Sequence, residues 1–421
     1  MKHSVYRFFE DRRLAGAVFG VILLCIPGDV RGYSMLTHEA IIDTLWIDTI
    51  TPILLMRFPT ASEEQLREAH AYAYGGCLIQ DLGYYPFGSH FFSDLTHYVR
   101  SADFLIALVD ESRDLNEYAF ALGALAHYGA DVDGHAIAVN RAVPLLYPKL
   151  QRQFGDEVTY ADNPRAHLKT EFGLDVLQVA RGHYAPTAYH DFIGFQVSKD
   201  LVERAFQKTY GLTLKDLFST LDLALGTYRF SVKTILPKVT ETAWSIKSKE
   251  IMKEQPTMSR ELFLYNMSRA SFEKEWGKDY ERHPGFGTRL LAIFLRVMPR
   301  FGPLKGLGFP VPTPEIERFF EDSFDAAVRR DRQAFNQTEA GHLRISNRDL
   351  DTGRPVSSGE YLLTDRTYDK LLTKLADKKF DGVSPALRDD ILNFYAQMKT
   401  PDKHGIGPQL NALKSFAKSG N

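Results

Sequence analysis

The residues between Asn116 and Asn140 constrain this chain more than any other part of its 421-residue sequence. His127, Asp131 and His135 stand four residues apart in an otherwise strongly apolar stretch, AFALGALAHYGADVDGHAIAV. On a continuous helix each step of four advances by only about 40°, so the three side chains share one face. Burial of an unpaired carboxylate costs roughly several kcal/mol, and a cation bound between the imidazoles would remove that cost. The dipeptide Asp133-Gly134 favours a bend before His135, which leaves the geometry there open.

His167 and Glu171 form a second pair four residues apart, on a helix that Asn163-Pro164 is expected to open. A histidine and a carboxylate one turn apart can chelate one metal ion. Taken alone, such a pair is more often an ion pair at the surface.

Further metal-ligating side chains accumulate upstream. His38 lies at the start of a predicted helix, Asp81 lies in the turn-rich stretch IQDLGYYP, and His97 lies in the aromatic stretch FFSDLTHY. His90 competes with His97 for the same role, and we favour His97. Imidazoles and carboxylates without a thiolate are typical of zinc in a hydrolytic site, and this many ligands would permit more than one ion.

The order of these residues resembles the zinc-dependent phospholipase C family, which is related to the S1/P1 nucleases. The resemblance covers about residues 33–180 and implies an all-α catalytic domain with up to three zinc ions. It is carried by His38, Asp81, His97, His127-x3-Asp131-x3-His135 and His167-x3-Glu171.

The resemblance also implies a ligand set for each ion. One zinc ion takes Asp81, His97, His127 and Asp131; a second takes His135, His167 and Glu171; a third takes His38, the bridging Asp131, and the amino group and carbonyl of Tyr33 as first mature residue. Asp81 is the candidate for orienting the attacking water or accepting its proton. The sequence departs from the family in having tyrosine rather than tryptophan at position 33. The Asp131–His135 spacing is also shorter than in the better-known phospholipases.

Helix signals recur along the whole chain, and no segment alternates apolar and polar residues as strands do. Predicted helix starts are Thr37, Ser62 with Gln65, Asp114, Asn163-Pro164, Thr313-Pro314 and Ser384-Pro385. We therefore expect an all-α phospholipase C/P1 nuclease-like domain at 33–200, followed by a helical extension of unknown function at 201–421. This extension does not read as the β-sandwich lipid-binding domain of some related toxins.

The N-terminus reads as a signal peptide covering residues 1–32. Basic residues precede a short apolar run from Leu14 to Ile26, and small residues at Val30 and Gly32 suit a signal peptidase. These features predict a secreted or periplasmic protein without a transmembrane span in the mature chain; a membrane-anchored N-terminus is the alternative.

Charge gives weaker guidance on the substrate. The formal net charge is -2, so there is no global field to attract nucleic acid. Residues 282–314 contain basic and apolar side chains but no acidic ones, which suits either an anionic membrane surface or packing on the core. We expect phospholipase C-type cleavage of phospholipid headgroups. A nuclease or other phosphodiesterase on the same site, and a helical protein with structural zinc, are the alternatives.

Overall fold

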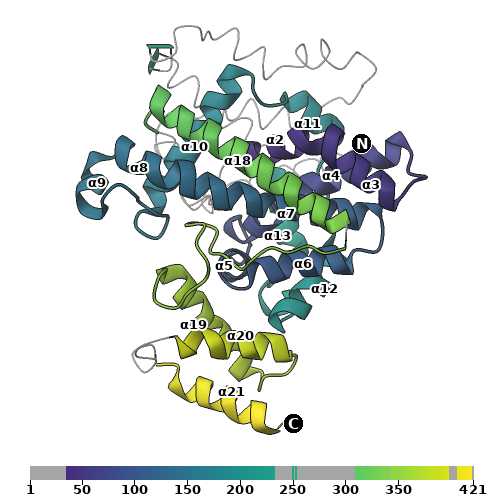
Figure 1. Cartoon of the computed structure of the whole chain (residues 1–421), viewed down its shortest axis with the longest axis vertical. Coiled ribbons are helices and arrows are strands. Elements are labelled where there is room, and N and C mark those ends of the chain that lie inside the picture. The colour runs from purple at the N-terminus through teal and green to yellow at the C-terminus, as the bar shows by residue number, and fades with distance from the viewer. Residues whose placement is uncertain are drawn as a thin grey trace, which may run out of the picture.

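The computed structural model describes residues 35–232, 249–250, 252–253, 309–339, 341–397 and 405–419. These residues form helices joined by turns and coils, and the described part contains no β-strand, only an isolated bridge between Arg348 and Pro355 (Figure 1). The all-α prediction is therefore confirmed. The predicted signal peptide, Tyr33 and most of the 282–314 segment lie outside the described residues.

The elements follow one another in a simple order. They are α2 (Met35–Leu45), the π-helix η1 (Trp46–Ile50), α3 (Thr51–Arg57), α4 (Glu63–Gly76), the 3₁₀-helix η2 (Ile79–Tyr84), α5 (His90–Tyr98), α6 (Ser101–Glu111), α7 (Leu115–Asp133), the π-helix η3 (Gly134–Val139), α8 (Asn140–Leu146), α9 (Pro148–Phe154), α10 (Pro164–Arg181), α11 (Thr187–Ile193), α12 (Lys199–Tyr210), η4 (Leu214–Asp216), α13 (Leu221–Phe230), α18 (Pro314–Glu339), α19 (Leu362–Asp377), α20 (Pro385–Ala396) and α21 (Gly407–Ser419).

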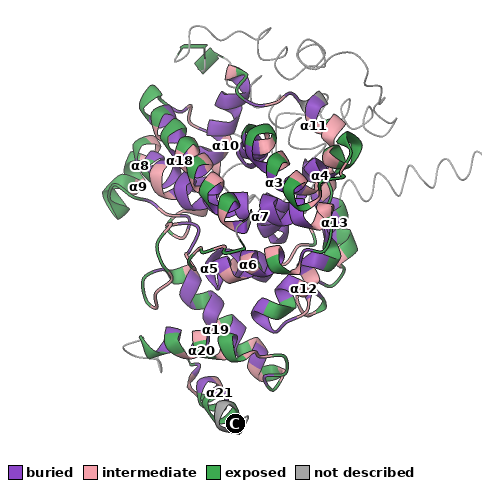
Figure 2. Ribbon diagram, turned by 45° about the vertical axis from the view of Figure 1, so that its right-hand side comes forward, coloured by how far each residue is buried: buried purple, intermediate pink, exposed green. Residues whose placement is uncertain are grey.

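Helix α7 is the centre of the fold. All of its residues from Tyr118 to Asp133 are buried, and it lies in the middle of the ribbon in Figure 2. Helices α4 and α18 pack along it, and α2 and α6 also contact it. The crossing of α4 and α7 is close because a Cβ at Gly123 would lie 2.1 Å from the carbonyl oxygen of Ala73. A helix this enclosed holds its polar side chains in fixed positions.

Several helix starts follow the predicted capping chemistry. Ser62 and Gln65 form a reciprocal capping box at α4, and the Asp114 carboxylate accepts the amide N–H of Glu117 at the start of α7. The prediction for Thr37 is wrong, because α2 already includes Met35. The Thr37 hydroxyl instead donates to Asp175 Oδ1 at 2.8 Å, since a buried carboxylate is the stronger acceptor.

The C-terminal part packs on the same body. Helix α18 runs along α7, and Arg330 of α18 donates two hydrogen bonds, of 2.7 and 2.8 Å, to the carboxylate of Asp133. Below it, α19 contacts α5, with the Lys370 ammonium 4.4 Å from the ring centre of Phe91. Across the residues described, no helix has both the length and the apolar character that spanning a membrane requires. The domain boundary near residue 200 remains a prediction.

Candidate metal centre

Eight buried side chains converge beside α7 from elements that are distant in sequence. They form three groups whose ligand atoms lie within 4.8 Å of one another: His38, His127 and Asp131; Asp81, His97 and His127; and His135, His167 and Glu171. Helix α2, η2 and α5 supply one member each, α7 supplies two, η3 supplies one and α10 supplies two. The structure thus brings together every predicted ligand that it describes.

Asp131 lies at the middle of the larger cluster. Its Oδ1 is 3.4 Å from His38 Nε2, while its Oδ2 is 3.0 Å from His127 Nε2 and 3.3 Å from His97 Nε2. The two carboxylate oxygens therefore face two different sets of nitrogen atoms. Such an arrangement allows one carboxylate to bridge two cations.

The Asp81 side chain enters the cluster from η2, with Oδ1 3.5 Å from His97 Nε2. Ser93 of α5 fixes this short element from both sides. The Ser93 hydroxyl accepts the amide N–H of Gly83 at 2.9 Å and donates to the carbonyl of Gln80. Asp81 is therefore held between two backbone groups that bind the same hydroxyl.

The remaining group lies at the junction of η3 and α10. Glu171 Oε1 is 2.6 Å from His167 Nδ1 and 3.6 Å from His135 Nε2. The chain changes from α7 to the π-helix η3 at Gly134, where the sequence suggested a bend. This wider turn separates His135 from His127 and Asp131 and directs it toward Glu171, as π-helical turns often do at functional sites.

The imidazole rings are oriented by acceptors on their far sides. His97 Nδ1 donates to the Ser93 carbonyl at 2.8 Å, and His127 Nδ1 donates to the Cys77 carbonyl at 2.9 Å. His167 Nε2 donates to the side-chain oxygen of Asn140 at 2.9 Å. A nitrogen that carries its proton toward such an acceptor leaves the opposite nitrogen as a lone pair facing the cluster, which is the tautomer that binds metal.

The carboxylates of this cluster fit a cation better than they fit the protein alone. Both oxygens of Asp81, both oxygens of Asp131 and Oε1 of Glu171 are buried and receive no hydrogen bond of good geometry, although imidazole nitrogens lie close to them. Leaving a buried charged acceptor unsatisfied costs about 1–3 kcal/mol or more. A donor set of imidazole nitrogens and carboxylate oxygens suits zinc, whose positive charge would satisfy all of these atoms.

The pKa shifts of the histidines in the ion-free cluster also indicate a metal site. Burial lowers the pKa of His38, and it lowers that of His167 to about 4, so both rings are neutral at pH 7. Burial also acts to lower the pKa of His97, but the Asp131 and Asp81 carboxylates together raise it well above its usual value. An incoming cation would have to displace that proton, so metal affinity should rise with pH.

Three other polar side chains, among them the competing His90, are not members of these groups. His90 is exposed in the first turn of α5, whereas His97 is buried among the ligands. His70 stacks on Trp46 with ring centres 3.9 Å apart. The Arg141 guanidinium lies 4.0 Å from the centre of the Phe319 ring.

Sequence reasoning missed the residues that orient the ligands, namely Ser93, Asn140 and the carbonyl groups of Cys77 and Leu350. The only sequence signal among them is Asn140, which is the polar residue that ends the apolar stretch of α7 and η3. A backbone carbonyl has no residue type to recognise.

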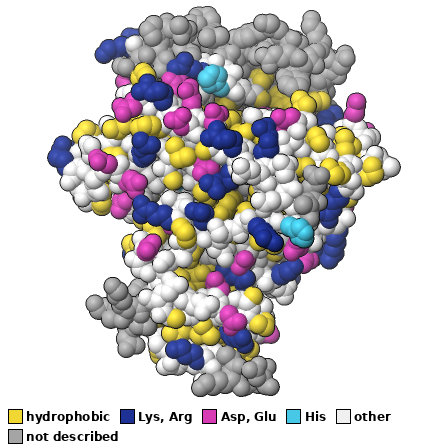
Figure 3. All heavy atoms as spheres, in the orientation of Figure 1, with side chains coloured by type: hydrophobic (Ala, Val, Ile, Leu, Met, Phe, Trp, Pro, Cys, Tyr) yellow, Lys and Arg dark blue, Asp and Glu magenta, His cyan; other side chains and the backbone are white. Residues whose placement is uncertain are grey.

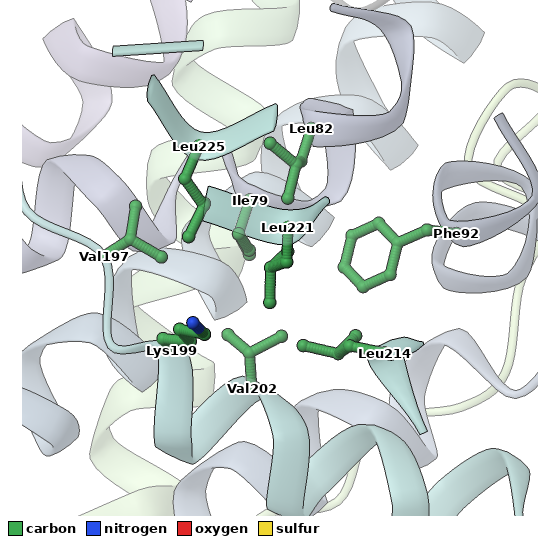
Figure 4. A pocket seen from close by; sticks show the side chains of 9 residues that line it. All are labelled: Ile79, Leu82, Phe92, Val197, Lys199, Val202, Leu214, Leu221 and Leu225. Atoms are coloured by element: carbon green, nitrogen blue, oxygen red, sulfur yellow. The ribbon is translucent and has the colours of Figure 1, made fainter. Parts of the chain in front are cut away.

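A separate apolar pocket lies beneath η2, between α5, α12 and α13 (Figure 4). It is lined by Ile79, Leu82, Phe92, Val197, Lys199, Val202, Leu214, Leu221 and Leu225. Its free volume of about 10 Å³ is about that needed by one water molecule. It is therefore too small for a headgroup or a nucleotide and is part of the core.

Comparison with known proteins bears on the same part of the chain. Residues 37–220 match the family model described as zinc dependent phospholipase C. The comparisons with curated proteins and with solved structures gave no match.

Proposed function

Because its residues 37–220 place this chain in the zinc-dependent phospholipase C family, whose members are phosphodiester hydrolases, we propose that it cleaves phospholipid headgroups. The reaction would be hydrolysis of the phosphodiester bond by an activated water molecule. The observation that carries the proposal is the cluster of buried carboxylates and imidazoles, in which Asp81 and Asp131 receive no hydrogen bond of good geometry.

We further propose that the cluster holds up to three zinc ions. The ligands would be Asp81, His97, His127 and Asp131 for one ion, His135, His167 and Glu171 for a second, and His38, Asp131 and the N-terminal Tyr33 for a third. Bound zinc supplies positive charge that stabilises the phosphodiester in its transition state and activates water at neutral pH.

Two of the proposed zinc ligands, Asp131 and Asp81, would have further roles. The two oxygens of Asp131 face His38 on one side and His97 with His127 on the other, which would hold two ions close together. Asp81 directs Oδ1 toward His97, so its carboxylate would orient the attacking water or accept its proton. The hydroxyl of Ser93 would keep that carboxylate in place.

The charges on one face of the molecule give no support for nucleic acid as the substrate. On the face shown in Figure 3, lysine and arginine side chains alternate with aspartate and glutamate and form no continuous basic strip. A nuclease needs a basic groove with stacking aromatic side chains. The basic and apolar segment at 282–314 is a candidate for peripheral contact with an anionic membrane.

Export is part of the proposal, because Tyr33 can bind metal only after residues 1–32 are removed. N-terminal sequencing of the secreted or periplasmic protein should begin at Tyr33. A different first residue would remove the proposed N-terminal ligand.

The decisive experiment combines metal analysis with two substrates. The purified mature protein should contain more than one zinc per chain and should hydrolyse phosphatidylcholine in vesicles but not single-stranded DNA. His97→Ala and Asp131→Ala should abolish hydrolysis. His90→Ala, on the same helix as His97 but exposed, should retain it. Absence of zinc would refute the metal centre, and cleavage of DNA alone would assign the site to a nuclease.

A further inference from the structure

The coil between α18 and α19 contains a tight loop at residues 347–356, outside the segment that matches the family. The backbone bridge between Arg348 and Pro355 closes it, and the Asp349 carboxylate accepts the amide N–H of Thr352 at 2.8 Å. Figure 1 shows this coil running back beneath α7 and past α5 before it reaches α19.

Side chains at the start of α6 fasten the loop. The Ser101 hydroxyl donates to the carbonyl of Arg348 at 2.7 Å and accepts its amide N–H at 3.1 Å. The side-chain oxygen of Asn347 accepts the amide N–H groups of Ala102 at 3.0 Å and Asp103 at 3.2 Å. The second pair satisfies donors at a helix N-terminus, so the loop replaces a cap that α6 lacks.

The tip of the loop reaches the end of α7. Gly353 has a φ of +67°, and a Cβ built there would lie 2.7 Å from the carbonyl oxygen of Val132. Val132 directly follows Asp131. A side chain at position 353 would therefore both strain the turn and lift the loop from the metal centre.

Two successive residues of the loop bind the ligands and their supports. The Leu350 amide N–H donates to the carbonyl of His97 at 3.1 Å, and the Leu350 carbonyl accepts from His135 Nδ1 at 3.2 Å. The Asp351 carbonyl accepts from the Asn140 amide at 2.7 Å. Asn140 in turn accepts from His167, so the loop acts on two ligands of the same group.

The Asp351 side chain is itself buried and accepts two hydrogen bonds. Its Oδ2 accepts hydrogen bonds from the hydroxyls of Tyr98 at 2.9 Å and Tyr361 at 2.5 Å. Its Oδ1 lies 3.7 Å from His135 Nδ1. At this distance Asp351 does not accept the Nδ1 hydrogen, which goes to the Leu350 carbonyl. Its negative charge beside the ring favours a proton on Nδ1 and therefore directs the Nε2 lone pair to the metal.

We propose that the 347–356 loop is an integral part of the metal centre and that Asp351 is a positioning residue for the zinc ion of His135, His167 and Glu171. This inference rests on the proposed metal centre. It extends the site to residues more than 120 positions beyond the end of the family match.

The test is a zinc competition titration of the full chain against a chelator of known affinity. Asp351→Asn keeps the shape of the side chain and removes its charge. It should lower the affinity for one zinc ion by about 10–100-fold and leave the affinity for the others unchanged. Excess zinc should restore lipid hydrolysis. Both changes act on the same ion, because Glu171→Gln removes one of its ligands. The double variant should therefore bind zinc no more weakly than Glu171→Gln alone.

Asp390→Asn is the matched control, since Asp390 also accepts a tyrosine hydroxyl, that of Tyr368, at 2.9 Å but contacts no ligand. It should bind zinc as the unmodified chain does. Unchanged zinc affinity in folded Asp351→Asn would overturn the inference. If that variant does not fold, Tyr361→Phe decides: weaker binding of one ion supports the inference, and unchanged binding overturns it. Absence of zinc from the unmodified chain would instead refute the metal centre itself.

Discussion

Replacing Ser93 with alanine should destabilise the protein far more than the loss of one oxygen atom suggests. Ser93 is fully buried, and its hydroxyl binds the amide of Gly83 and the carbonyl of Gln80, on either side of Asp81. Both backbone groups would lose this buried partner. At about 1–3 kcal/mol for each lost partner, the free energy of unfolding should fall by about 2–6 kcal/mol.

The assay is urea unfolding in the presence of a chelator, so that zinc binding does not contribute to the measured stability. Thr96→Val is the control, because Thr96 is equally buried on the same helix but donates only to carbonyls of α5 itself. It should cost less than about 1.5 kcal/mol. If Ser93→Ala costs no more than Thr96→Val, the hydroxyl is not what holds Asp81. A second readout is zinc content, which should fall in Ser93→Ala alone.

Three further outcomes follow from other parts of the structure. Gly123→Ala should lower the thermal unfolding midpoint and reduce the free energy of unfolding by about 1–3 kcal/mol, because its Cβ would meet the Ala73 carbonyl. Gly226→Ala is the control and should not destabilise the protein, because the space at its Cβ is open. Burial acts to lower the pKa of His190, but the Glu39 carboxylate 3.0 Å away raises it to about 9. This ion pair should stabilise the protein fully below about pH 6.5 and cease to do so as the pH rises through 9. The loss is at most about 3 kcal/mol. A profile of stability against pH for His190→Gln should lack this decrease. Finally, chelation should lower the free energy of unfolding by about 2.7 kcal/mol per ion, relative to protein with zinc at 100-fold its Kd, and the urea midpoint should fall accordingly. An unchanged midpoint would contradict zinc binding.

Much of the helical architecture could be predicted because its signals are local. The Ser62–Gln65 capping box, the Asp114 cap and the Asn163-Pro164 start all depend on residues within one turn of each helix terminus. Thr37 shows the limit of such signals. Its hydroxyl binds Asp175, which is 138 residues away, and no local pattern indicates that competing acceptor.

The same distinction applies to the metal centre. Ligands at helical spacing, such as His127 with Asp131, could be recognised because an apolar surrounding makes polar side chains conspicuous. The division of the ligands into groups was implied only by the family resemblance, because residue spacing does not show the π-helical turn after Gly134. The groups that orient the imidazoles were missed, since the carbonyls of Cys77 and Leu350 depend on tertiary contacts and not on residue type.

The hydrogen bond from His135 to the carbonyl of Leu350 spans 215 residues of sequence, and this distance has a consequence for biosynthesis. At about 5–20 residues per second, the ribosome adds Leu350 roughly 10–40 s after His135. During that interval the nascent imidazole has no fixed acceptor, and either nitrogen can carry its proton. The support of this imidazole can therefore form only after Leu350 has been added, and a gene fragment that stops after the family match would encode the centre without it.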